Sequence, residues 1–224
     1  MAIAFLRSAT AAFTVASNLN ITFGATASDN DIIVVQTIYA GNSPTNAGFS
    51  EFTASGYSAL EYTTGFFLRM HWKRASGESS ATYNFSRTGS NWIALQGAEY
   101  SGCITTGNPV DIASNNQENS NAPTWLSITT TVANTMTVGC GRQEDGGTLT
   151  VPTSTTGRQT SGGTWWWDDP QPASGASGDR SGSSSATNNC GMHHFALKEQ
   201  AAATAKAPPP FRQARRYRTL RRAA

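Results

Sequence analysis

Residues 31–39 read DIIVVQTIY, a run in which apolar side chains occupy both of the faces that a strand presents. Successive side chains of a strand point to opposite faces of its sheet, so this pattern predicts a strand that is covered on both sides. The β-branched residues support the same interpretation because they are enriched in strands. We therefore place residues 31–39 at the centre of a sheet.

Further strand candidates lie on both sides of this run. Upstream, Leu19, Ile21 and Phe23 alternate with polar residues, as in a strand with one buried and one solvated face, and Gly24 ends it. Two turn-forming sequences, SGESS and RTGSN, separate some of the strand candidates. Others are separated by predicted loops or polar stretches, at residues 41–48, 114–122 and 168–189. The downstream candidates are residues 66–72, 82–85, 92–100, 125–132, 135–140, 148–151 and 193–198.

About ten short strands without helical periodicity predict an all-β fold, an antiparallel β-sandwich of the jelly-roll kind. Two alternatives remain: an immunoglobulin-like sandwich, which usually needs only about 100 residues, and a parallel β-helix, which requires a fixed-period repeat. We expect three parts: a sandwich domain at residues 1–199, an Ala/Pro-rich linker at 200–210, and a basic C-terminal docking arm at 211–224.

The charges of the chain are divided unevenly between its two ends. The last nineteen residues, KAPPPFRQARRYRTLRRAA, hold seven of the sixteen basic residues and no acid. Residues 1–205 then hold 16 − 7 = 9 basic and 14 acidic residues, so a body of formal charge −5 precedes an arm of +7. Such a division indicates a globular module with a docking arm.

The arm combines arginines with apolar side chains, and this combination favours docking to a protein. Three prolines, at 208–210, would form a stiff spacer. The apolar residues fall at helix-compatible spacings, so they could be buried on a partner while the arginines pair with carboxylates. A nucleic acid bound through its phosphates is the alternative partner. The predicted docking residues are Phe211, Arg212, Arg215, Arg216, Tyr217, Arg218, Leu220, Arg221 and Arg222.

Three consecutive tryptophans, at 165–167, form an aromatic cluster that a ligand could use. On a strand, Trp165 and Trp167 share one face, Trp166 takes the other, and at least one of the three should lie in the core. The favoured interpretation is core packing with a subunit contact, because aromatic residues are enriched at interfaces. A host-surface glycan is the alternative, with Trp165 and Trp167 stacking on sugar rings and Asp168 and Asp169 accepting hydroxyl hydrogen bonds.

The sequence offers little catalytic or metal-binding chemistry. Nucleophile-elbow, phosphate-loop, zinc-protease and dinucleotide motifs are absent, so we expect no enzyme, no catalytic residue and no cofactor. We expect no metal either, because His193 and His194 are adjacent and would point to opposite faces, one inward and one to solvent. The three cysteines, Cys103, Cys140 and Cys190, lack a metal-type spacing and should be free and mostly buried.

The order of several segments resembles the β-sandwich virion proteins of tailed bacteriophages and prophage-like particles. The matching segments are SATAAFTV, SDNDIIVVQTIYAGN, NWIALQGAEYSG with the NPVDI turn, TWLSITTTVANTMTVGCG, SGASGDRSGSS and HHFALKE, within residues 8–199. The resemblance implies a structural or accessory role on a capsid or tail, as head decoration, head fibre or tail accessory. It carries no catalytic residues, and the basic arm is not part of the pattern.

These observations lead to one main functional hypothesis. We expect a non-enzymatic virion protein that is made in the bacterial host cytoplasm. Its arm would attach it to other virion structural proteins. A homo-oligomer is expected, with a trimer as our guess because closed cyclic assemblies are common. We expect no secretory signal, because the N-terminal apolar stretch is interrupted by Arg7. We expect no membrane span either, because the longest purely apolar run, Ile32 to Val35, is far below the roughly 18 residues that a span requires.

Overall fold

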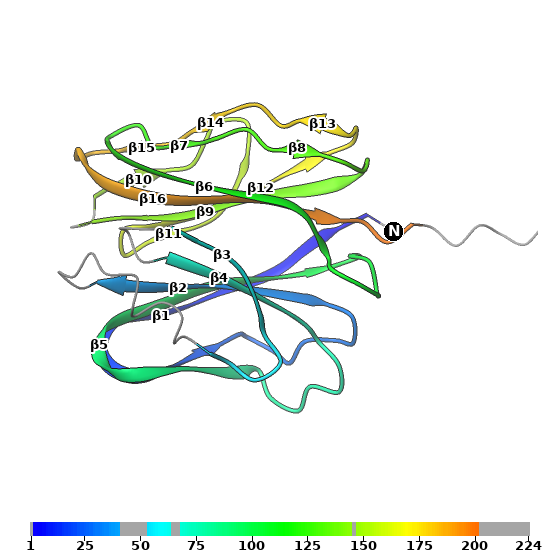
Figure 1. Cartoon of the computed structure of the whole chain (residues 1–224), viewed down its shortest axis with the longest axis horizontal. Helices are drawn as coiled ribbons and strands as arrows, with labels where there is room; N and C mark the ends of the chain where they lie inside the picture. Colours follow the sequence, from blue (N-terminus) through cyan, green and yellow to red (C-terminus); the bar gives the residue numbers. More distant parts are fainter. Residues whose placement is uncertain (1, 41–52, 64–67, 145–146, 202–224) are drawn as a thin grey trace, which may run out of the picture.

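A computed structural model describes residues 2–40, 53–63, 68–144 and 147–201, and strands are the regular elements of these residues. Two five-stranded antiparallel sheets face each other, and a layer of short strand pairs covers the outer side of the second sheet (Figure 1). The predicted class, an all-β antiparallel sandwich, is confirmed. Nowhere in the described part of the chain does a helix occur that could cross a membrane.

The chain builds the two sheets one after the other. The first sheet has the order β1 (Ala4–Thr22), β5 (Thr82–Ser101), β2 (Ile32–Ala40), β4 (Leu68–Arg74) and β3 (Ser58–Thr63). The second sheet has the order β11 (Thr156–Ser161), β12 (Thr164–Gln171), β9 (Thr135–Gln143), β16 (Asn188–Lys198) and β6 (Val110–Ser120). Strand β2 pairs with β5 on one side and β4 on the other, which confirms its predicted central place.

Three pairs of two-residue strands form what we call the outer layer. They pair β7 (Thr124–Trp125) with β14 (Arg180–Ser181), β8 (Thr129–Thr130) with β13 (Gly175–Ala176), and β10 (Leu149–Thr150) with β15 (Ser183–Ser184). Figure 1 shows them stacked over β6, β9, β12 and β16. The predicted loop at residues 168–189 is therefore largely a covering layer, with its first residues still in β12.

The fold has three separate cores, one within the first sheet and one in each of the two spaces between layers, because strand side chains alternate between faces. In β2, Ile33 and Val35 point into the curl of the first sheet, where they pack with residues such as Phe23 and Leu95. Ile32 and Val34 point the other way, between the two sheets. A third core lies between the second sheet and the outer layer and contains Trp125, Trp165, Trp167, Cys190 and Met192.

Two predicted breaks in the strands are wrong. The RTGSN sequence does not end a strand, since β5 runs continuously from Thr82 to Ser101, and it pairs with β1 along most of its length through three register irregularities. The polar stretch at 114–122 is mostly strand β6, which pairs with β16 at the edge of the second sheet. An edge strand exposes many of its side chains, so its sequence is polar without being a loop.

Candidate functional site

The predicted docking arm lies outside the described residues, but the point from which it starts is described. Strand β16 ends at Lys198, beside the start of the chain (Figure 1). The backbone N–H of Gln200 donates to the Gly102 carbonyl at 2.8 Å, and its side-chain oxygen accepts from the Thr105 N–H at 2.9 Å. Residue 200 is thus held by the segment after β5, so whatever follows starts from a fixed place.

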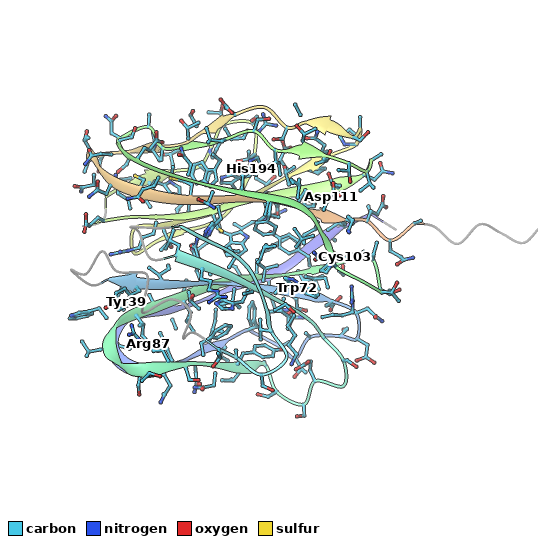
Figure 2. All side chains as sticks on the ribbon, in the orientation of Figure 1. Tyr39, Trp72, Arg87, Cys103, Asp111 and His194 are labelled. Atoms are coloured by element: carbon cyan, nitrogen blue, oxygen red, sulfur yellow. The ribbon has the colours of Figure 1, made fainter. Side chains whose placement is uncertain are left out.

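A small cavity of about 300 Å³ lies beside this starting point. Its wall includes Glu199 together with Ile3, Met136, Pro170 and Pro172. Both ends of the described chain therefore contribute to the same recess. Cys103 forms a β-bridge with Glu199 and is labelled at this end of the sandwich in Figure 2.

The three tryptophans lie in β12 and all are buried, with 0% exposure. Trp165 and Trp167 face the outer layer, and each meets the Trp125 ring edge-on at a centroid distance of 5.7 Å. Trp166 faces the first sheet and donates to the Tyr100 hydroxyl at 3.0 Å. The alternation within the strand was predicted correctly, and the expectation of at least one core tryptophan is confirmed.

The glycan interpretation of Trp165 and Trp167 requires a correction. An indole can stack on a sugar only if one ring face is open to solvent, and both rings are covered by the outer layer. The glycan interpretation assumed that one face of the strand is open to solvent, as a period-two pattern usually indicates, whereas this sheet is covered on both faces. The structure places these two side chains in the third core.

The aspartates after the tryptophans form ion pairs within the chain. Asp168 is 1% exposed, and both of its carboxylate oxygens accept from Arg158 at 2.8 Å. The Tyr100 hydroxyl lies 3.3 Å from one of these oxygens. Asp169 is half-buried and accepts from Arg180 at 2.9 Å. Paired, largely covered carboxylates of this kind fix the ends of β11 and β14 to β12, which is a structural role.

Two glutamines and a histidine form a polar group between the two sheets that the sequence reasoning missed. The Gln96 amide nitrogen donates to the Gln36 side-chain oxygen and lies 3.3 Å from the Trp165 carbonyl oxygen of the opposite sheet. The Gln36 amide nitrogen then donates to Nδ1 of His193 at 3.1 Å, which leaves the imidazole proton on Nε2. These bonds between the sheets favour one alignment of the two sheets, although Nε2 of His193 and Oε1 of Gln96 are buried without a partner among the described residues.

All three histidines are buried, so the prediction that His194 or His193 faces solvent is wrong. His194 lies between the second sheet and the outer layer (Figure 2), and its Nδ1 donates to the Leu126 carbonyl at 2.8 Å. Burial lowers the pKa of His71 and His193 to about 3 and that of His194 to about 4. At neutral pH these side chains are uncharged parts of the interior.

The three cysteines are free and buried, as predicted. Burial raises the pKa of Cys103 to about 12 and that of Cys190 to about 11, and it raises the pKa of Cys140 well above its ordinary value. The nucleophilic form of cysteine is the thiolate, and burial disfavours it at all three positions. These thiols serve as packing groups.

Among the residues that the structure describes, no three His, Cys, Asp or Glu side chains gather where they could hold a metal ion. The carboxylates of Asp168 and Asp169 are paired with arginines as described above, and Glu144 accepts from Asn189 at 2.9 Å. Comparison with known proteins gives no match: no protein-family model, no curated protein and no solved structure is significantly similar to this chain.

Proposed function

We propose that this protein is a non-enzymatic structural or accessory protein of a tailed-phage-like particle, attached to neighbouring subunits through its basic C-terminal arm. The observation that carries the proposal is the division of charge in the sequence, with −5 on residues 1–205 and +7 on the last nineteen. Opposite charges held on two separate parts of one chain favour head-to-tail contacts between subunits.

The contacts within the body support this division. Arg7, Lys73, Arg158 and Arg180 each form an ion pair with a carboxylate of the same domain. Arg74 donates to two backbone carbonyls, of Ile104 and Gly107. These cations of the body are engaged inside it, so the arm is the larger separate source of positive charge for an external partner. A partner with an acidic groove, including a second copy of this body, suits the arm.

The starting point of the arm also supports attachment. Because Gln200 is hydrogen-bonded to the segment after β5, a force on the arm would be transmitted directly to both sheets. Arginine is suited to this role because its planar group binds a carboxylate through two hydrogen bonds and so fixes orientation.

The direct test is incorporation into particles. The full chain is compared with a chain lacking residues 206–224 and with one in which the seven basic residues of that segment are glutamine, and each is followed through density-gradient purification of particles. We expect both variants to be lost from the particle fraction, and a chain with lysine in place of the six arginines to be retained only in part. Unchanged incorporation of the shortened chain would contradict the proposal.

Nucleic-acid binding through the arm is the competing explanation of the same charges, and salt separates the two. Binding to phosphates weakens steeply with salt, by about 0.9 decades per decade of salt for each phosphate neutralised. A gel-shift titration of the full chain with duplex and single-stranded DNA measures this dependence. Tight, salt-sensitive DNA binding that is lost when the arm is deleted would show that the arm binds nucleic acid and would contradict protein docking.

A further inference from the structure

A polar cavity of about 560 Å³ lies on the flank of the first sheet, away from the tryptophan cluster. It is formed by the segment before β3, by β4, by the turn after β4 and by the first half of β5. Its volume is within the range of small-ligand sites, which is about 300–1,000 Å³. The residues that line it are Thr53, Ala54, Ser55, Tyr57, Lys73, Glu78, Ser79, Ser80, Thr82, Tyr83, Asn84 and Ser86.

Two tyrosines form an aromatic wall whose position is fixed. The rings of Tyr57 and Tyr83 meet edge-on at 5.8 Å, and Tyr57 also packs on Phe85 at 5.0 Å. Gly56, with φ of +78°, allows the tight turn that presents Tyr57, whose N–H donates to the Ala54 carbonyl at 3.1 Å. The wall is therefore preorganised, which reduces the entropy lost when a ligand binds.

An ion pair lies against this wall. The Lys73 ammonium is 2.7 Å and 3.0 Å from the two carboxylate oxygens of Glu78, and 5.3 Å from the centre of the Tyr83 ring. The pair offers donors and acceptors side by side, and its two charges cancel. A free anion would meet the Glu78 carboxylate next to the ammonium that attracts it, so the site favours a neutral ligand.

Hydroxyl groups complete the lining. Ser55 and Ser79 are exposed at the cavity, and Thr53, Ser80, Thr82 and Ser86 add further hydroxyls around it. The Tyr57 hydroxyl is buried and makes no hydrogen bond with the rest of the described chain, and burial keeps its pKa above the ordinary value. It is thus a protonated donor whose hydrogen bond a ligand could supply after a small movement of the ring.

We propose that this cavity binds a neutral saccharide unit. A sugar ring has an apolar face that can lie on Tyr57, which is half-buried, whereas Tyr83 is only 8% exposed and supports Tyr57 from the side. The sugar hydroxyls can both donate to Glu78 and accept from Lys73. The many hydroxyls of the lining disfavour an apolar ligand, because its binding would leave them without partners. The inference does not depend on the arm or on the attachment proposed for it.

The test uses the full chain and four probes, namely glucose, galactose, mannose and N-acetylglucosamine, with inorganic phosphate and glycine as charged comparators. Ligand-observed NMR detects binding and calorimetry measures it. We expect at least one sugar to bind with a Kd below about 10 mM. Glu78→Gln and Lys73→Met should each weaken this binding at least tenfold. Glu144→Gln is the matched control, because Glu144 is an exposed glutamate away from the cavity, and should leave it unchanged.

Three results would overturn the proposal: no binding of any of the four sugars, sugar binding that survives Glu78→Gln, or binding of phosphate or glycine in place of the sugars. Thermal unfolding of each variant accompanies the measurement, so that lost binding is not mistaken for lost fold. If Lys73→Met does not fold, Glu78→Gln alone decides, because it keeps the size of the side chain and removes only its charge. The loss of particle attachment in the shortened chain would leave this test unaffected.

Discussion

Acidification should unfold this protein, and its three buried histidines should be the main cause. In the unfolded chain a histidine has a pKa near 6.5, whereas burial lowers the pKa of His71 and His193 to about 3 and that of His194 to about 4. A group with a depressed folded-state pKa contributes stability above its unfolded pKa, and this contribution is lost as the pH falls toward the folded-state value. The window for these histidines is therefore pH 6.5 down to about 3–4.

The size of the loss follows from the same values. Each histidine costs about 1.4 kcal/mol for every pH unit below 6.5, so the three together remove about 4 kcal/mol at pH 5.5 and about 8 kcal/mol at pH 4.5. One buried acid acts in the opposite direction. Burial raises the pKa of Glu99 to about 7, although the neighbouring Arg7 lowers it. Its contribution is complete below its unfolded pKa and is lost as the pH rises through 7.

The balance between the two effects favours the histidines. Between pH 7.5 and 4.5 the protonation of Glu99 offsets only part of the loss of about 8 kcal/mol, because one group with a raised pKa opposes three with lowered pKa values. Domains of this kind are stable by only about 5–15 kcal/mol, so unfolding should begin near pH 4.5.

Urea unfolding at pH 7.5, 6.5, 5.5 and 4.5, followed by tryptophan fluorescence, measures this dependence. In His193→Gln the free energy of unfolding should fall less steeply with decreasing pH, by about 1.4 kcal/mol per pH unit. In Glu99→Gln it should fall more steeply. A free energy of unfolding that stays constant or rises between pH 6.5 and 4.5 would refute the reasoning. An unchanged slope in His193→Gln would refute the assignment to that residue.

Three further predictions concern the second sheet and its cover. A Cβ on Gly139 would lie 2.0 Å from the Trp167 ring, so Gly139→Ala should destabilise the fold by about 3 kcal/mol or more in urea unfolding; a cost below about 1 kcal/mol would show that the ring can move. Trp165→Ala should cost about 3–5 kcal/mol in the same assay, and a neutral effect would argue against its core position. Arg158→Met leaves the Asp168 carboxylate buried without its cation and should lower the free energy of unfolding by roughly 3 kcal/mol. The double variant Arg158→Met with Asp168→Asn should recover part of this loss. No recovery would count against the ion pair as the cause.

The central strand and the fold class could be predicted because they depend on local pattern. DIIVVQTIY is apolar on both faces, and the only arrangement that covers both faces is a sheet between two cores. Gln36 within this run, and Gln96 within NWIALQGAEY, were visible as amides in otherwise apolar strands. That signal predicts a buried hydrogen-bonded pair, but it cannot identify His193, 157 positions away, as the third member.

The overturned glycan interpretation of Trp165 and Trp167 and the wrong solvent exposure expected for one of His193 and His194 share one cause, which is the outer layer. Its six strands are two residues long, and a period of two cannot be recognised in two residues. The layer is instead specified by single contacts, such as the Trp125 indole N–H on the Cys140 carbonyl at 3.0 Å and the Asp179 carboxylate on the Ser127 N–H at 2.7 Å. Small residues allow the close approach, since a Cβ on Gly182 would lie 3.1 Å from the Trp125 ring. A segment rich in serine and glycine can thus be a tightly packed cover, and its composition alone does not distinguish it from a surface loop.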